Sequence, residues 1–109
     1  MVELGWVEST LPTAAENVNG VPFTYELNQN YPNPFNPSTE IEFSLAKSGP
    51  TIVQVYNVMG QLVQTLVEKK LEAGNHSINF RADYLSTGVY FYSIKSGEFS
   101  QIKKMMLLK

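Results

Sequence analysis

The feature that most constrains this chain is a succession of short segments in which apolar and polar residues alternate, each bounded by turn residues. In the segment 40–45, Ile41, Phe43 and Leu45 alternate with glutamate and serine. Successive side chains of a β-strand point to opposite faces, so this pattern predicts a strand with one buried and one solvated face. A helix would instead need apolar residues three or four positions apart.

Five further strands are expected, at a spacing of about 8 to 12 residues. They cover 51–58, 62–67, 76–80, 89–95 and 99–108, with turns at Met59-Gly60, 72–75 and 96–98. The first of these is apolar on both faces, which is typical of a central strand covered by a layer on each side. The pattern predicts an all-β fold, an immunoglobulin-like antiparallel β-sandwich of about six to seven strands, with a barrel as the alternative.

Composition narrows the class of protein. The chain has 109 residues, enough for one domain, and 43% of them are hydrophobic against 17% charged, which indicates an ordered core. The formal charge of −2 gives no net attraction for nucleic acid, although lysines make the C-terminal end locally basic. The chain contains no cysteine, which excludes disulfides and thiolate metal sites.

The first 24 residues differ from the rest, because they show neither helical nor strand periodicity. They are interpreted as a linker or the end of a preceding domain, followed by the β-domain at 25–109. Trp6 in this segment suggests a contact with a neighbouring domain or, alternatively, a sugar-stacking residue. No stretch is apolar enough to span a membrane, and the N-terminus lacks a signal-peptide pattern, so an export signal is expected upstream in a longer precursor.

No arrangement of residues predicts catalysis, a cofactor or a metal site. The single histidine, His76, has no partner at metal-ligand spacing and is interpreted as an ordinary strand residue. Glu40 and Glu42 lie two apart on one strand face, where solvation explains them more simply than acid–base chemistry. The chain is therefore expected not to be an enzyme.

A proline-rich segment precedes the first long strand. Three prolines fix their own φ angles and remove three backbone donors, so the segment cannot be a central strand. We expect it to cover a sheet edge, with Tyr31 and Phe35 anchored in the core. This signature segment consists of Tyr31, Pro32, Asn33, Pro34, Phe35, Asn36 and Pro37.

The C-terminal end is unusual because four consecutive apolar residues and three lysines finish the chain. One interpretation is a strand that completes the core with one face, either Ile102, Met106 and Leu108 or their alternates. The other is a surface for a partner, which could dock by adding a strand to this edge. The residues predicted to recognise a partner are Lys103, Lys104, Met105, Leu107, Leu108 and Lys109.

Several motifs in order give a more specific indication. They are Leu27 with 29–37; Thr39, Ile41, Phe43 and Leu45; Val55-Tyr56-Asn57 with Gly60-Gln61 and Val63; Ala73-Gly74 with His76; 85–90 with Tyr92; and 104–109. Over residues 25–109 this series resembles the type A C-terminal sorting domain of the type IX (Por) secretion system of the Bacteroidetes kind. Phe80 departs from the family pattern, where many members carry tryptophan.

The resemblance implies a delivery label rather than a catalyst. It implies that a covalently linked upstream cargo passes through the periplasm and that outer-membrane secretion machinery recognises the domain and exports the cargo to the cell surface. There a sortase-like partner is expected to cut the label off, often attaching the cargo to lipopolysaccharide. Neither a nucleic acid nor a transmembrane span of its own enters this scheme.

Two other classes of function stay open on the sequence. A carbohydrate-binding module would use exposed aromatic residues, and Tyr90 with Tyr92 have the spacing of such a platform on one strand face. An immunoglobulin-like spacer or adhesion domain would need no particular C-terminal residues. Burial of the two tyrosines would exclude the platform.

Overall fold

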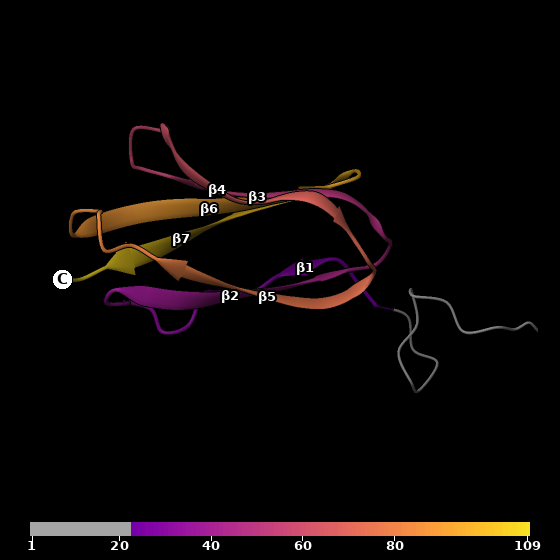
Figure 1. Ribbon diagram of the computed structural model, residues 1–109, viewed down its shortest axis with the longest axis horizontal. Coiled ribbons are helices and arrows are strands. Elements are labelled where there is room, and N and C mark those ends of the chain that lie inside the picture. Colours follow the sequence, from indigo (N-terminus) through magenta and orange to yellow (C-terminus); the bar gives the residue numbers. More distant parts are fainter. Residues whose placement is uncertain (1–22) are drawn as a thin grey trace, which may run out of the picture.

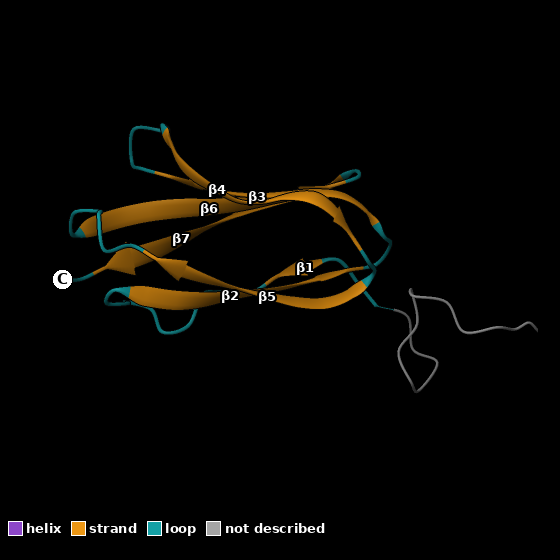
Figure 2. Ribbon diagram, viewed as in Figure 1, coloured by secondary structure: helices purple, strands orange, loops and turns teal. Residues whose placement is uncertain are grey.

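A computed structural model describes residues 23–109, and within them the fold is a sandwich of two antiparallel sheets without a helix (Figures 1 and 2). The expected linker, with Trp6, lies outside the described residues except for Phe23 and Thr24. The strands are β1 (Glu26–Leu27), β2 (Ser38–Leu45), β3 (Gly49–Tyr56), β4 (Leu62–Leu71), β5 (Gly74–Arg81), β6 (Gly88–Ser96) and β7 (Phe99–Leu107).

The connectivity is that of an immunoglobulin-like sandwich. One sheet has the order β1-β2-β5 and the other β4-β3-β6-β7, and neighbouring strands in both sheets are antiparallel. Figure 1 shows the two sheets as separate layers, with β7 and β4 at opposite edges of the larger one. The predicted sandwich is confirmed, and the barrel alternative is wrong because the two sheets do not join into one.

Alternation along the strands sets the core, as expected. In β2, Ile41, Phe43 and Leu45 are buried, and the expected parity of β5 holds, with Phe80 buried and its neighbours exposed. Apolar residues of β3, β6 and β7 face them from the other sheet. The fully buried side chains of this second layer include Val53, Val55, Tyr92, Ile94, Met105 and Leu107.

Strand β3 corrects one expectation. It was predicted to be buried on both faces, but only alternate residues are buried, while Ile52, Gln54 and Tyr56 are partly exposed. The reason is that no third layer formed by residues 23–109 covers the outer face of the four-stranded sheet. Val58, expected at the end of this strand, lies in the following turn and is exposed. An apolar outer face is therefore left open.

The turns follow local chemistry. Between β3 and β4, the side-chain oxygen of Asn57 accepts hydrogen bonds from the backbone N–H groups of Met59 and Gln61. Gly60 adopts a φ of 81° there, which a residue with a side chain rarely tolerates. Strands β6 and β7 are joined by two residues, Gly97 and Glu98, because Ser96 is already paired with Phe99. This short hairpin fixes the register of β7.

Candidate functional site

Strand β7, at one edge of the larger sheet, carries the residues predicted for recognition. Met105 and Leu107 point into the core and are buried, so the alternates to Ile102, Met106 and Leu108 are the core-facing set. Lys104 and Leu108 are exposed, and Lys103 is partly exposed. The predicted recognition residues thus divide into two that pack the core and others whose side chains reach the surface.

The signature segment covers the outer edge of β7. The side-chain amide of Gln29 donates to the carbonyl of Lys104 at 2.7 Å, and the N–H of Met106 donates to Asn33 Oδ1 at 3.0 Å. The backbone of Phe35 makes two further hydrogen bonds to this edge. Its N–H donates to the carbonyl of Met106 at 2.9 Å, and its carbonyl accepts from the N–H of Leu108 at 3.0 Å.

The expectation that the segment protects a sheet edge is therefore confirmed, and the edge is the last part of β7. Phe35 and Leu107 form an isolated parallel bridge, so the segment pairs with the edge of the sheet at this point. The same contacts contradict strand addition by a partner along this stretch of the folded domain. A partner strand would have to displace the segment, since the backbone groups of Met106 are already bonded.

The two aromatic residues of the signature segment have opposite environments. Phe35 is 2% exposed and lies 6.1 Å from Phe80, ring centre to ring centre, so its predicted core role is confirmed. The same prediction for Tyr31 is wrong, because Tyr31 is 80% exposed. Tyr31 is paired with Glu40 across the sheet edge, and directly opposed residues share a face. Since Glu40 points to solvent, Tyr31 does too.

A buried polar network holds the start of the segment. The side-chain amide of Asn30 donates to the carbonyl of Pro32 at 3.1 Å and to the hydroxyl of Thr39 at 3.0 Å. Thr39 in turn donates to the same Pro32 carbonyl at 2.9 Å. Asn30 and Thr39 are almost fully buried, and buried polar groups of this kind are costly to leave unpaired. The network therefore fixes the path of the chain into the signature segment.

Tyr92 connects this network to the centre of the larger sheet. Its hydroxyl accepts a hydrogen bond from the N–H of Asn30 at 2.8 Å and donates one to the carbonyl of Asn28 at 2.7 Å. Burial raises the pKa of Tyr92 to about 12, although the Asn30 N–H partly opposes this by favouring the phenolate. The neutral hydroxyl is the form that can make both bonds. In the sequence, a tyrosine in the middle of an apolar strand was the signal for this contact, because a buried hydroxyl needs a hydrogen-bond partner. From the sequence, Tyr92 is considered instead for a sugar-binding platform.

The C-terminal residue is tied to the loop between β5 and β6. The N–H of Lys109 donates to the hydroxyl of Thr87 at 3.0 Å, and its ammonium donates to the carbonyl of Asp83 at 2.6 Å. Asp83 itself pairs with Arg81, whose guanidinium lies 3.0 Å from its carboxylate. Lys109 is therefore held at the surface, beside the end of β7, whose outer edge the signature segment covers.

The remaining candidate residues have structural roles. Tyr90 and Tyr92 are buried, which excludes the carbohydrate platform on that strand face. His76 contacts the carbonyl of Glu72 at 2.7 Å, with its ring stacked on Phe43. Hydrogen bonds from Ser77 and Asn79 lower the pKa of Glu40, as expected for a solvated carboxylate with donors.

Within residues 23–109 there is no cluster of three or more histidine, cysteine, aspartate or glutamate side chains that could hold a metal ion. In the same part of the chain, no helix is long and apolar enough to cross a membrane.

Comparison with known families agrees with this geometry. The family model described as the secretion system C-terminal sorting domain matches residues 29–108, which include the signature segment, the network around Asn30 and all of β7. The chain belongs to this family. Membership in this family supports a role as a type IX secretion signal. Such a signal implies export of a linked cargo to the cell surface or the extracellular space. No curated protein matches the chain.

Proposed function

We propose that residues 25–109 form a non-catalytic label that carries a covalently linked upstream cargo from the periplasm, through the type IX machinery of the outer membrane, to the cell surface. The segment 1–24 then acts as the linker in which a sortase-like protease cuts. The family match supports this role, and the alternation of β7 suggests how the label is read.

The observation that carries the proposal is the clamped end of β7. Its core-facing residues, Met105 and Leu107, fix the strand in the sandwich, while the signature segment occupies its edge. Recognition in the folded state then depends on side chains that reach the surface. These are Lys103, Lys104, Leu108 and Lys109. A strand whose backbone is already fixed loses less conformational entropy on binding, so it makes a better ligand than a frayed terminus.

The test is export of a reporter that carries residues 25–109 at its C-terminus, behind a periplasmic signal peptide, in a cell with the type IX system. We expect the reporter at the cell surface. The combined change Lys104→Ala and Lys109→Ala should leave the reporter in the periplasm, and so should deletion of the last five residues. Combined Lys69→Ala and Lys70→Ala, on the opposite edge of the same sheet, is the matched control and should be exported normally.

The double lysine variant is the sharper of the two changes, since the deletion also removes the buried Met105 and Leu107. Unchanged export of both the lysine variant and the deletion would exclude this assignment. A wild-type domain that is folded but leaves its reporter in the periplasm would instead favour the immunoglobulin-like spacer.

A further inference from the structure

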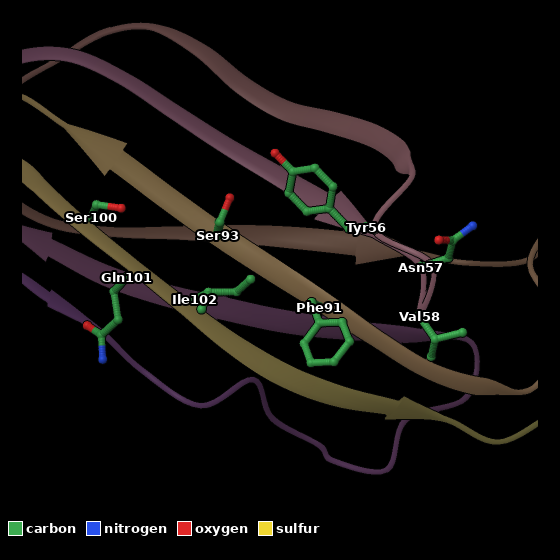
Figure 3. A pocket seen from close by; sticks show the side chains of 9 residues that line it. Tyr56, Asn57, Val58, Phe91, Ser93, Ser100, Gln101 and Ile102 are labelled. Carbon is green, nitrogen blue, oxygen red and sulfur yellow. The ribbon is translucent and has the colours of Figure 1, made fainter.

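The outer face of the four-stranded sheet carries an apolar groove that the proposed delivery role does not use. It has a volume of about 540 Å³ and lies over β3, β6 and β7. Figure 3 shows Tyr56, Phe91 and Ile102 along it, with Ser93 between them. Ile102 is 59% exposed although it is apolar. No layer of residues 23–109 covers this face. The apolar side chains that β3 carries on this side are therefore left partly exposed.

The register of the strands places these side chains in rows. Phe91 lies opposite Tyr56 on β3 and opposite Lys104 on β7. The next row contains Ser93 with Ile102, and the row after it contains Lys95. Directly opposed residues of antiparallel strands share a face. The groove is therefore a continuous surface with one lysine at each end.

The tyrosine in the groove is fixed by side-chain hydrogen bonds. The Tyr56 hydroxyl donates to Gln54 Oε1 at 2.8 Å, and Gln54 Nε2 donates to the Thr65 hydroxyl on β4 at 3.2 Å. This chain of bonds holds the ring in place and occupies the donor of its hydroxyl group. A surface that is already ordered loses less entropy on binding.

The charges on this face have one dominant sign. Among residues 23–109, no charged side chain lines the groove, but Lys95 and Lys104 flank it, and both are exposed. Glu68 on β4 lies opposite Ile52, which also pairs with Lys95, so this carboxylate shares a row with Lys95 but not with Lys104. Within residues 23–109 neither flanking lysine forms an ion pair. Lys104 lies opposite Phe91, and Phe91 is four residues from Lys95 on the same strand. The two lysines are therefore separated by about 13 Å along the strands.

We propose that this groove binds an extended segment of a protein partner that has an apolar residue at its centre and carboxylates on either side, about four residues apart. This inference rests on the proposed function, because Lys104 belongs to both surfaces and the partner is a component of the same secretion machinery. An extended chain repeats its side-chain direction every second residue, so residues i and i+4 face the two lysines while i+2 enters the groove.

The flanking lysines favour an acidic peptide over a neutral saccharide. The groove lining itself offers both apolar side chains, such as Val58 and Ile102, and polar ones, such as Asn57 and Gln101, and either ligand could contact these. A neutral saccharide gains nothing from the two lysines, whereas acidic side chains do.

The test uses cargo that carries the full chain at its C-terminus, expressed in a cell with the type IX system. Ile102→Glu places a carboxylate in the groove, and Asn75→Glu is the matched control, since Asn75 is exposed on β5 of the other sheet and does not line the groove. Lys95→Glu is paired with Lys69→Glu. We expect surface delivery to fall about tenfold for Ile102→Glu and Lys95→Glu, as an uncompensated carboxylate or a reversed charge weakens docking by that order.

Delivery of both groove variants within about twofold of their controls would overturn the inference while leaving the sorting role intact. Failure of the wild-type cargo to reach the surface would overturn both.

Photo-crosslinking identifies the occupant. Benzoylphenylalanine replaces Phe91 or, as control, Asn75 on the other sheet, and the crosslinked peptide is sequenced. The inference predicts a crosslink specific to position 91, in a peptide with an apolar residue flanked by carboxylates. A saccharide or lipid adduct at position 91, or no crosslink above that at position 75, would overturn it.

Discussion

The two edges of the four-stranded sheet are protected by different means. At the β4 edge, consecutive charged residues Glu68, Lys69 and Lys70 are exposed, and charge discourages pairing with another strand. At the β7 edge, the signature segment occupies the backbone groups around Met106. The first device is local in sequence. The second joins residues about 70 positions apart, so the outer edge of β7 is covered only when the signature segment has packed against it.

This difference bears on the proposal that the C-terminal strand is the part of the domain that is recognised. The backbone of Met106 and Leu108 is held by the distant signature segment, so the covered edge exists only in the folded domain. We therefore expect changes in the segment to act on β7, and changes at the β4 edge to leave β7 intact. The following predictions test that contrast, from the largest effect to the smallest.

The largest effect is expected from Phe35→Ala. Phe35 is buried against Phe80 and its removal leaves a cavity, so the free energy of unfolding should fall by about 3 to 5 kcal/mol. Tyr31→Ala, in the same segment but 80% exposed, should change it by less than about 0.5 kcal/mol. Chemical denaturation measures both. Equal losses for the two variants would show that the segment is not anchored through Phe35.

The next effect is expected from Asn30→Ala. It leaves the Pro32 carbonyl and the Thr39 hydroxyl with one partner fewer, so stability should fall by about 1 to 3 kcal/mol. Hydrogen exchange at the amides of Met106 and Leu108 should accelerate as well, because both bind the segment. Asn36→Ala, an exposed change in the same segment, serves as control. If exchange at both amides is unchanged, the Asn30 network does not hold the signature segment against β7.

A smaller effect is expected at alkaline pH. The folded pKa of Tyr92 is about 12 against an ordinary value of 10, so stability is complete below pH 10 and is lost as pH rises through 12. The loss attributable to Tyr92 is about 2 kcal/mol. Denaturation midpoints between pH 9 and 12, compared with Tyr92→Phe, measure it. The variant should be less stable at neutral pH and show a shallower decline; an identical decline would assign it to other groups.

The smallest change in stability is expected for Lys104→Ala. The side chain is exposed and forms no ion pair within residues 23–109, so the free energy of unfolding should change by less than about 0.5 kcal/mol. Thermal denaturation checks this. A large loss of stability would mean that Lys104 supports the fold, and its effect on export would then say nothing about recognition.

Alternation along the chain was sufficient to predict the sandwich, since strands such as β2 are apolar on one parity only. It could not settle β7, where both parities are apolar and only the pairing with β6 places Met105 and Leu107 inward. The function followed from ordered motifs that resemble a family, because no single residue of a non-catalytic label has distinctive chemistry.

Contacts between distant segments were beyond the sequence. Tyr31 and Phe35 look equivalent as anchors, and only the pairing of Tyr31 with Glu40 separates them. The double role of the Tyr92 hydroxyl also requires knowing that Asn28 and Asn30 pass over β6. The outer groove is open because the described residues form two layers and not three, and the number of layers cannot be deduced from one apolar strand.

The most direct measurement compares folding and delivery in the same cells. A reporter carrying residues 25–109 with combined Lys104→Ala and Leu108→Ala would be assayed for protease resistance of the domain and for arrival at the cell surface. We predict a resistant, folded domain whose reporter stays in the periplasm. Normal surface delivery of this folded variant would contradict recognition through the outward side chains of the clamped strand.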